Sequence, residues 1–473
     1  MKAQILATLL LAATVGGCAS GASQSVSRLN VPEKWSTAQA SDAVSFRTDW
    51  WRLLNDTALD ALVERALKRN YDLAKADANL RAARALAGEA RAARFPGGSV
   101  SGSIQRMRQS AAAQPAMEAS PDRFPDQRLA DLGAELSWEL DILGALAATG
   151  REAKADIVEA QWHRRQVEAA VAAATVRAYV DLKAFSQIEQ NALARSAALS
   201  KVVERLDRGS ALGEIPRDRV EEAIAALESL RLELPLIQLQ ARNAARRISV
   251  LTGEAPQIGV ASLSDWSGGP LAAPPDLAIA DPARTLRLRP DVGAAEARLG
   301  AALARISIAE AALYPRIAFS GSAGSTGEPK VFSATGAFRF AYGPQLTWGV
   351  FDLARTRARI GAANAGAEAA LAAWEQTSLA ALEEADGALD ALASWRAAAE
   401  AATRAAAAAE RASTHAKLRL EGGQGSALDA VRADIQRLAT EAAARDAKAN
   451  VTRAWIDAHL ALGGGWRESP TGP

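Results

Sequence analysis

The side chains of this chain that could carry chemistry are a group of carboxylates and three histidines. The carboxylates occur close together at Glu383, Glu384, Asp386 and Asp390. Paired acids can act as general acid and base, but on one long predicted helix they are more typical of a polar face or a tube lining. The histidines are His163, His415 and His459. They lack metal-ligand spacing, and no Gly-rich phosphate loop follows a strand. We therefore expect no catalytic residue, no metal and no cofactor, and the chain is not expected to be an enzyme.

The N-terminus has the features of a secretory signal. Lys2 precedes an apolar run from residue 5 to residue 15. That run is shorter than the roughly 20 apolar residues of a membrane-spanning helix, and small residues follow it, as they do before a cleavage site. Residues 1–17 are therefore predicted to be a signal peptide.

The only cysteine, Cys18, lies where such a signal would end. Val15-Gly16-Gly17-Cys18 resembles a bacterial lipobox, which predicts that Cys18 is lipidated and begins a lipidated N-terminal segment, residues 18–48. The alternative is an ordinary signal peptide with an incidental cysteine. The residue after the cysteine is Ala19. In the bacterial sorting rule for such motifs, an Asp at this position favours retention at the inner membrane, so Ala19 favours sorting to the outer membrane.

Composition excludes several other classes of protein. The 473 residues carry 55 basic and 54 acidic side chains, a net charge of +1, which suggests neither a nucleic acid nor an acidic surface as partner. A single cysteine allows no intramolecular disulfide, so stability must come from packing and assembly. After Cys18, no stretch is long and uncharged enough for a transmembrane helix. If the chain crosses a membrane, it must do so with strands closed into a barrel.

Two segments predict helices far longer than those of ordinary globular proteins. Residues 151–208 contain no Gly or Pro and would form a helix about 85 Å long, and residues 354–420 contain only three glycines. Small apolar residues recur at spacings of three and four, a coiled-coil-like pattern with alanine at the contact positions. Each long helix is expected to turn back into a second one, at 217–251 and 426–462, with Pro235 kinking or interrupting the first of these. Shorter helices are expected at 56–94 and 290–313.

Four segments alternate in hydropathy with a period of two, near 98–108, 129–142, 316–326 and 336–351. The apolar positions include Leu136, Trp138, Phe338, Phe340 and Trp348. The polar positions include Asp131, Glu135, Glu139 and Arg339. About ten alternating residues is typical of a transmembrane barrel strand, so the apolar set is predicted to face lipid and the polar set the lumen. The alternative is a half-buried sheet in a soluble protein, with the polar set simply solvated.

Four strands cannot close a barrel, because small barrels begin at about eight strands. Unpaired strand edges are not tolerated in hydrocarbon, so either the sheet is soluble or several chains share one barrel. A cyclic homotrimer would give about twelve strands and close every edge by symmetry. The predicted fold is thus mixed but mainly α, a long-helix coiled-coil α-barrel plus a four-stranded share of a trimeric 12-stranded transmembrane β-barrel.

The sequence also repeats itself at a period of roughly 210 to 220 residues, longer than a solenoid repeat. Arg94-Phe95-Pro96 corresponds to Leu313-Tyr314-Pro315, and the segment around Trp138 to that around Trp348. Arg205-Leu206-Asp207-Arg208-Gly209 corresponds to Arg419-Leu420-Glu421-Gly422-Gly423. These matches predict an internal two-fold duplication. Its parts are a first repeat (49–260), a linker or equatorial segment (261–289), a second repeat (290–466) and a tail (467–473).

Several motifs, in order along almost the whole chain, resemble one known family. They are Trp51 with Asn70-Tyr71-Asp72-Leu73, Ser137-Trp138-Glu139-Leu140-Asp141-Ile142-Leu143-Gly144, Arg289-Pro290-Asp291-Val292, Pro344-Gln345-Leu346-Thr347-Trp348, and Leu462-Gly463-Gly464-Gly465-Trp466. Over residues 46–466 the chain is similar to TolC-type outer-membrane efflux factors, in their OprM/NodT-like lipoprotein branch.

The resemblance implies a homotrimer in the bacterial outer membrane with a periplasmic helical extension and an equatorial belt. Its partners would be outer-membrane lipid, a periplasmic adaptor (membrane fusion) protein and an inner-membrane pump. It would have no cofactor and would be a passive exit duct for drugs or other small molecules, driven by the pump. The alternative is a lipid-anchored periplasmic coiled-coil adaptor or scaffold protein without a channel, although an adaptor should carry more strands.

The same resemblance places a periplasmic gate where the last helix begins, and the first acidic residue there is Asp429. Three copies would form a carboxylate ring near the axis, which favours cations. Where the TolC type has a second acid one turn later, this chain has Arg432, so an Asp429–Arg432 pair within or between chains is open as well. The alternative is that Asp429 only stabilises the helix N-terminus, and the two roles can coexist.

The two hairpin tips are the expected adaptor-docking surface. The residues assigned to it are Arg205, Leu206, Gly209, Arg419, Leu420, Gly422 and Gly423. Gly422, Gly423 and Gly425 are expected to adopt positive φ. A generic loop explains these glycines equally well, but the parallel Arg-Leu-acid-X-Gly sequence in both tips favours a shared contact.

Overall fold

In a computed structural model of the chain, the residues described are 29–37, 49–108, 125–261 and 272–464. The chain divides into two units, residues 1–30 and 31–473, and all described helices and strands belong to the second. The signal peptide, Cys18 and the tail 467–473 lie outside the described residues. Lipidation of Cys18 therefore stays a prediction.

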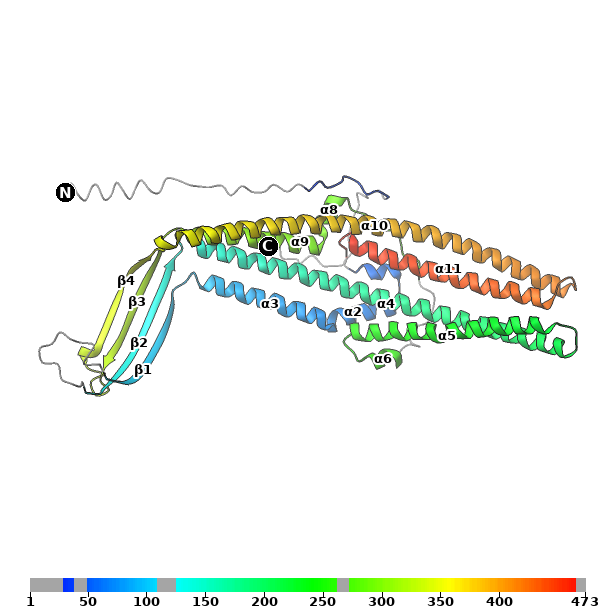
Figure 1. Cartoon of the computed structure of the whole chain (residues 1–473), viewed down its shortest axis with the longest axis horizontal. Coiled ribbons are helices and arrows are strands. Elements are labelled where there is room, and N and C mark those ends of the chain that lie inside the picture. The colour runs from blue at the N-terminus through cyan, green and yellow to red at the C-terminus, as the bar shows by residue number, and fades with distance from the viewer. Residues whose placement is uncertain (1–28, 38–48, 109–124, 262–271, 465–473) are drawn as a thin grey trace. The chain divides into compact units, whose positions relative to one another are not determined.

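The second unit is mainly α-helical and contains one small antiparallel sheet, which confirms the predicted mixed, mainly α class (Figure 1). Its α-helices are α2 (Thr57–Arg69), α3 (Tyr71–Ala92), α4 (Ala145–Ala211), α5 (Arg217–Leu251), α6 (Pro256–Ala261), α8 (Pro282–Leu288), α9 (Pro290–Ala311), α10 (Leu353–Glu421) and α11 (Ala427–Ala461). Short 3-10 turns are η1 (Trp50–Leu54), η3 (Thr335–Ala337) and η4 (Val350–Asp352). The strands are β1 (Gly97–Met107), β2 (Gln127–Leu140), β3 (Arg316–Gly327) and β4 (Phe338–Thr347).

The two longest helices, α4 and α10, have 67 and 69 residues, so each is about 100 Å long. α4 packs against α5 and α10 against α11, giving two helical hairpins, and α4 also contacts α3, α9 and α11 (Figure 1). Many of the buried contact positions are alanines, which allow helix backbones to approach closely and have the highest helix propensity. In the described part of the chain, no helix combines the length and the apolar character needed to span a membrane.

The helix expected over residues 56–94 is divided in two. Asn70 has ψ 132°, outside the helical region, and its Oδ1 accepts hydrogen bonds from the backbone N–H groups of Asp72 (2.9 Å) and Leu73 (3.2 Å). Asn70 thereby ends α2 and caps α3. Short polar side chains compete with the helix for backbone donors, which is why the break falls at this residue.

Pro235 does not interrupt the helix expected at 217–251, because α5 is continuous from Arg217 to Leu251, and a kink at this position stays a prediction. A proline inside a helix removes one backbone donor and leaves the carbonyl four residues earlier without it. Here both Pro235 and Arg231 are exposed, so water can take the place of that donor.

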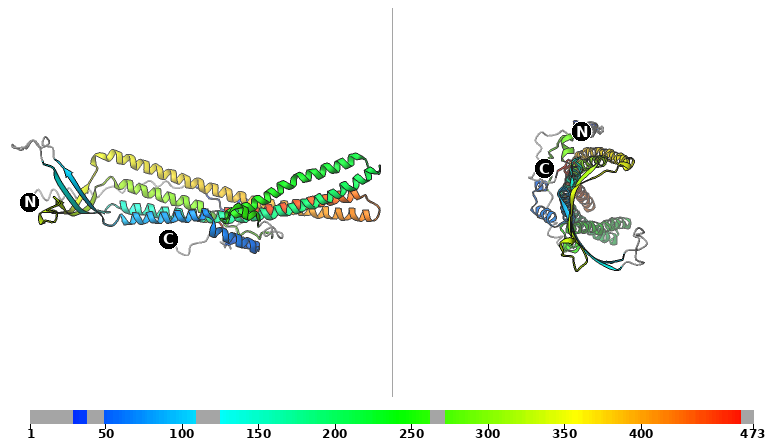
Figure 2. Two further views of the ribbon diagram at one scale, coloured as in Figure 1. Left: turned by 90° about the horizontal axis from the view of Figure 1, so that it is seen from below. Right: turned by 90° about the vertical axis from the view of Figure 1, so that its left-hand side faces the viewer.

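The sheet has the order β1-β2-β3-β4, with all neighbours antiparallel. Strands lie where the alternating segments predict them, except that β4 ends at Thr347 rather than near 351. Gly349 departs from extended geometry at φ −85° and ψ 58°, and the following residues form η4. Trp348 therefore lies just beyond the strand. Among the described residues, no helix lies over either face of the sheet (Figure 2).

The largest buried cluster lies where η1, α2, α4, α5 and α11 meet, around Trp50, Tyr179 and Trp455. The ring centroids of Trp50 and Trp455 are 5.5 Å apart. At its edge, Asp56 caps α2 and also accepts hydrogen bonds from the Tyr179 hydroxyl (2.9 Å) and Lys183 Nζ (2.8 Å). Burial alone would raise the pKa of Asp56, but these donors outweigh it and lower the pKa.

Two contacts occur twice, at matching places in the two halves of the second unit. Trp138 Nε1 donates to the Arg94 carbonyl (3.1 Å), and Trp348 Nε1 donates to the Leu313 carbonyl (3.0 Å). These bonds join the end of the sheet to the helix before it.

The second repeated contact is at the far end of each returning helix. Asn70 Nδ2 donates to the Leu251 carbonyl (3.1 Å), and Arg289 Nη1 donates to the Ala461 carbonyl (2.9 Å). Both donors stand directly before a helix, α3 or α9, and each satisfies a carbonyl of the last turn of α5 or α11, which has no intrahelical partner.

Candidate channel wall and hairpin tips

The sheet sorts its side chains onto two faces of different chemistry. Residues directly opposite in an antiparallel pair share a face. Through the pairs Asp131↔Thr326, Glu135↔Ser322, Glu139↔Ala318 and Gly324↔Arg339, the register places the predicted lumen residues on one face. That face, called the polar face below, is otherwise made mostly of Gly, Ala, Ser, Thr and Gln.

On the polar face, Arg339 of β4 reaches across β3 to Asp131 of β2. Its Nη2 is 2.9 Å from Asp131 Oδ2, and its Nε donates to Thr326 Oγ1 at 2.8 Å. The path is open because Gly324 and Gly133 lie beneath it, and a Cβ on Gly133 would come 3.2 Å from Arg339 Nη2. Two glycines thus allow an ion pair to cross three strands.

The opposite face, called the apolar face, carries large side chains that nothing in the described chain covers. It includes the predicted lipid-face residues Leu136, Trp138, Phe338 and Phe340, and Phe340 is 67% exposed. Isolated exposed apolar residues are normal, but a contiguous face of this kind indicates an interaction with membrane or protein. Trp348, predicted for the same face, is half-exposed beyond the end of β4.

The residues predicted for the docking surface at the tip of the first hairpin differ in their exposure. Arg205 is exposed, but Leu206 and Gly209 are buried. Leu206 packs with Val202 and Val220, and a Cβ on Gly209 would come 2.7 Å from Ile215 Cδ1. Leu206 and Gly209 therefore hold the returning chain against α4, and their assignment to the docking surface stays a prediction.

The second tip differs from the prediction in its glycines. Gly423 has φ +69°, as expected, but Gly422 has φ −77°, and Gly425 is not among the residues of positive φ. Gly425 is instead needed for close approach, since a Cβ there would come 3.2 Å from Arg419 Cβ. Arg419, Gly422 and Gly423 are exposed, and Leu420 is half-buried.

The two tips share a backbone turn, but not in the register of the Arg-Leu-acid-X-Gly sequences. Gly213 (φ +76°) occupies in the first tip the place of Gly423 in the second, since Glu214 N donates to the Gly209 carbonyl as Gln424 N does to the Arg419 carbonyl. Arg419 thus corresponds to Gly209, four residues after Arg205. The parallel sequences are one helical turn out of step, so they do not make equivalent contacts.

Asp429 lies in the first turn of α11 and acts in helix capping. Its backbone N–H donates to Ser426 Oγ (3.1 Å), and Ser426 Oγ donates to Asp429 Oδ2 (2.7 Å). Its side chain is exposed. Arg432 pairs within this chain with Glu222 of α5, at 3.8 Å. An Asp429–Arg432 contact between chains stays a prediction.

Two of the four neighbouring carboxylates, Glu384 and Asp386, and the histidine His459 have structural partners. Glu384 is 2.5 Å from the buried Arg289, and Asp386 accepts two hydrogen bonds from Ser36. His459 is buried beside Trp50 and Trp455, with ring centroids 4.9 and 5.6 Å away. Burial lowers the pKa of His459 to about 4. In the described ranges, no group of three or more His, Cys, Asp or Glu side chains could hold a metal ion.

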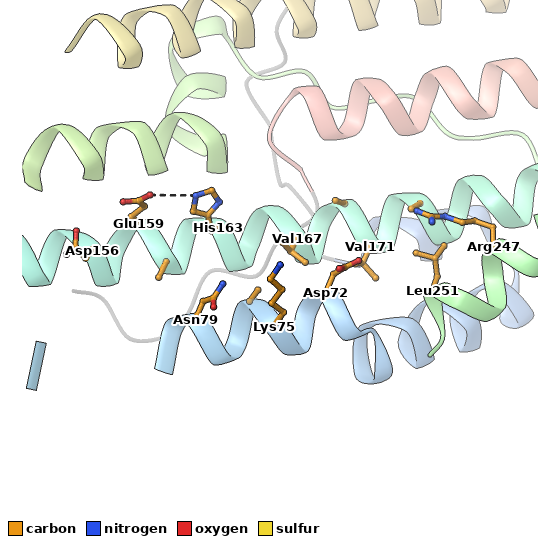
Figure 3. A pocket seen from close by; sticks show the side chains of 14 residues that line it. Asp72, Lys75, Asn79, Asp156, Glu159, His163, Val167, Val171, Arg247 and Leu251 are labelled. Atoms are coloured by element: carbon orange, nitrogen blue, oxygen red, sulfur yellow. Dashed lines mark ion pairs between the residues drawn. The ribbon is translucent and has the colours of Figure 1, made fainter. Parts of the chain in front are cut away.

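A groove that the sequence analysis missed lies between α3 and α4 and reaches α5 (Figure 3). Its polar lining includes Asp72 and Lys75 from α3 and Glu159 and His163 from α4. Glu159 lies 3.7 Å from His163 and 2.6 Å from Arg298 of α9. Because the lining comes from helices far apart in sequence, no local motif could have revealed it.

Long helical hairpins are joined to a sheet with one polar and one uncovered apolar face, an arrangement that fits an outer-membrane channel. Comparison with known proteins gives the same answer. The model of the family described as outer membrane efflux protein matches residues 62–254 and 282–464. The chain belongs to this family.

Individual relatives match over nearly their whole length. The outer membrane protein OprJ of Pseudomonas aeruginosa is 29% identical over 469 residues, which cover 98% of this chain and 96% of OprJ. The nodulation protein T of Rhizobium leguminosarum bv. viciae is 25% identical and covers 98% of this chain and 93% of its own. The solved outer-membrane channel OprN has a TM-score of 0.81 and 30% identity, and covers 92% of this chain and 98% of its own.

A likeness at lower identity concerns the fold alone. The outer membrane channel CmeC of Campylobacter jejuni has a TM-score of 0.82 at 21% identity, and covers 94% of this chain and 96% of its own. This chain is an efflux channel component of the outer membrane, in a family of transport channels rather than enzymes. The alternative of an adaptor or scaffold without a channel is not supported.

Proposed function

We propose that three copies of this chain form a passive exit duct across the outer membrane, each giving four strands to a 12-stranded β-barrel. The sheet supports this because β1 and β4 are open edges, and open edges are not tolerated in hydrocarbon. Joining β4 of one copy to β1 of the next closes all edges by three-fold symmetry. The apolar face would contact lipid, and the polar face, with Asp131, Glu135, Glu139 and Arg339, would line the lumen.

The long hairpins would continue the duct into the periplasm as a helical tube. Three copies of α4, α5, α10 and α11 would surround the axis, and the exposed tip residues Arg205, Arg419, Gly422 and Gly423 would meet a periplasmic adaptor. Energy would come from an inner-membrane pump that passes cargo through the adaptor. Two relatives in Pseudomonas putida are described as outer membrane proteins of a toluene and of an antibiotic efflux pump, which supports drugs or other small molecules as cargo.

The duct would be closed at rest by the first turns of α11. Asp429 is exposed there, and three copies would form an acidic ring that favours cations and can be titrated or bridged. Arg432 of a neighbouring copy could supply the counter-charge, or stay paired with Glu222. Capping through Ser426 is compatible with either arrangement, because it leaves one carboxylate oxygen of Asp429 free.

Cys18 would carry the lipid that holds the N-terminus at the outer membrane, with residues 18–48 as the anchored segment. One acyl chain binds a membrane only marginally, so lipidation would orient the chain while the barrel holds it. Support comes from the lipobox-like sequence Val15-Gly16-Gly17-Cys18. Further along the segment, Trp35 Nε1 donates to the Ala280 carbonyl (2.7 Å) and fixes this part to the helical unit.

One duplicated unit would have given rise to the two halves of the chain, residues 49–260 and residues 290–466. Residues 261–289 would join the two halves. What supports this is the pair of contacts that occur twice, from Trp138 and Trp348 to the preceding helix and from Asn70 and Arg289 to the returning helix. The same duplication would make each copy contribute two similar hairpins to the tube.

The proposal is tested by assembly and conductance of the full-length chain purified from membranes. We expect a species three times the mass of the chain that survives mild detergent electrophoresis, and ion conductance in planar bilayers. A variant with the charged pair Leu136→Asp and Phe340→Asp on the apolar face should lose both, whereas Leu232→Asp, at a helical position that is more exposed than either, should retain both. A monomer without conductance would refute the duct.

A further inference from the structure

A cluster of arginines lies at the end of the β1–β2 hairpin that is remote from the helices. Arg106 and Arg128 are directly opposite each other in the antiparallel register, so their side chains share a face. It is the apolar face, because Ile104, Leu132 and Val100 lie two, four and six residues along the strands on the same side. Arg108 lies one residue beyond β1.

Among the described residues, these three arginines have one carboxylate partner, Asp126. Asp126 is shared, with Arg106 Nη2 at 2.7 Å and Arg108 also paired to it. In the described part of the chain, no carboxylate pairs with Arg128. Like charges directly opposite in a sheet are destabilising, so an anion bound beside Arg106 and Arg128 would offset the positive charge that Asp126 leaves unbalanced.

The position of the cluster along the strand indicates which kind of anion it binds. Trp138, on the same face of β2 and bonded to Arg94, lies ten residues from Arg128, which is about 34 Å of strand. At the tilt of about 45° usual for barrel strands, this is about 24 Å along the membrane normal, close to the roughly 25 Å height of an outer-membrane apolar band. If Trp138 marks one border of that band, Arg128 lies at the other.

We infer that Arg106, Arg108 and Arg128 form a binding site for the phosphate groups of lipids in the outer leaflet, most of all phosphorylated glycolipids. A guanidinium can bind two phosphate oxygens at once. The apolar face directly beside the cluster would contact the acyl chains of the same lipid. This site rests on the proposed barrel, but it is not needed for a conducting duct.

The test measures lipid binding to the purified full-length protein by native mass spectrometry. The probes are a bisphosphorylated, acylated diglucosamine lipid, the same lipid without its phosphates, and inorganic phosphate. Each arginine near a membrane surface contributes about a fivefold change in binding to anionic lipid. Arg106→Gln with Arg128→Gln should therefore weaken binding of the bisphosphorylated lipid about 30-fold.

Three matched measurements make the result specific. Arg106→Lys with Arg128→Lys keeps the charge and should retain most of the binding. Arg231→Gln with Arg404→Gln, which removes two exposed arginines on helices, should bind as the wild type does. The lipid without phosphates should bind both the wild type and the glutamine variant equally weakly.

The inference is overturned if the glutamine variant binds the bisphosphorylated lipid as tightly as the wild type, or if the lipid without phosphates binds the wild type equally well. It is also overturned if millimolar inorganic phosphate displaces the lipid, since the site would then be one for free anions. Conductance of the same preparations separates the two proposals. A wild type that conducts but shows no phosphate-dependent binding refutes only the lipid site, and a wild type that does not conduct refutes the duct.

Discussion

Arg432 of α11 lies 3.8 Å from Glu222 of α5, so an ion pair joins the two hairpins close to their tips. Both side chains are more than half exposed, and such pairs contribute only about 0–1 kcal/mol. This ion pair therefore adds little to what holds the two hairpins together at the end where a gate is proposed, where Val431 of α11 also packs against Val202, Leu206 and Val220. A weak link of this kind can break when the hairpins move apart, without unfolding either of them.

The first prediction concerns Asp429. Asp429→Ala should raise the single-channel conductance in planar bilayers and the antibiotic sensitivity of cells that carry the variant, because three carboxylates would be lost from the constriction. The matched control is Asp218→Ala, which removes an acid from the first turn of α5. Conductance that is the same in Asp429→Ala, Asp218→Ala and the wild type would remove Asp429 from the gate and leave it as a helix-capping residue.

A second prediction compares two glycines with nearly the same backbone. Gly253 has φ +73° and Gly213 has φ +76°. A Cβ on Gly253 would come 2.7 Å from the Arg69 carbonyl oxygen, whereas a Cβ on Gly213 meets nothing within 4 Å. Either Ala substitution costs about 1–2 kcal/mol for the left-handed conformation, and Gly253→Ala should cost about 1–3 kcal/mol more for the clash.

Thermal unfolding followed by the helical circular dichroism signal distinguishes the two variants. Gly253→Ala should unfold at a clearly lower temperature than Gly213→Ala, which in turn should lie slightly below the wild type. Equal midpoints for the two variants would mean that the contact between Gly253 and α2 does not constrain the folded chain.

The polar face of the sheet makes a third prediction, about ion selectivity. Glu135 and Glu139 have no ion pair among the described residues, whereas Asp131 is paired with Arg339. Glu135→Gln with Glu139→Gln should therefore lower the preference for cations, measured as the reversal potential across a KCl gradient, because six carboxylates would leave a three-fold lumen. Glu135→Asp, which keeps the charge, should leave the reversal potential within error. Unchanged selectivity in the double variant would place these residues outside the lumen.

The elements that depend on periodicity were predictable from the sequence. The stretch without Gly or Pro before Gly209 requires a long helix, and alternation around Leu136 and Phe340 requires strands with two different faces. Both predictions follow from local spacing, which depends only on the geometry of a helix or a strand. The register confirms that the apolar and polar residues occupy opposite faces.

Features that depend on contacts between distant segments were not predictable. Leu206 reads as a tip residue, but it is buried because Val220 returns against it. Arg432 reads as a partner for Asp429 one turn away, yet it lies beside Glu222, 210 residues earlier. Asn70 could have been predicted as a helix cap from the sequence alone, because Asn is one of the residues preferred at the position before the first turn of a helix.

A last prediction follows from the burial of His459. Its folded-state pKa is about 4, below the value of about 6.5 expected in an unfolded chain. As the pH falls from about 6.5, the unfolded chain binds a proton that the folded chain does not, so the free energy of unfolding decreases. The contribution is fully present above pH 6.5, and about 3 kcal/mol is lost by pH 4.

His459→Phe should remove this part of the pH dependence, because Phe cannot take up a proton and, since neither ring nitrogen of His459 has a hydrogen-bond partner among the described residues, loses no hydrogen bond. The measurement is urea unfolding at pH 7, 5.5 and 4.5, with the difference between variant and wild type taken at each pH, so that carboxylates common to both cancel. His415→Gln, an exposed position on α10, should follow the wild type. A wild type and a His459→Phe variant whose stabilities fall in parallel would show that His459 stays accessible to protons in the folded chain, because a histidine enclosed by Trp50 and Trp455 resists protonation until the cluster opens.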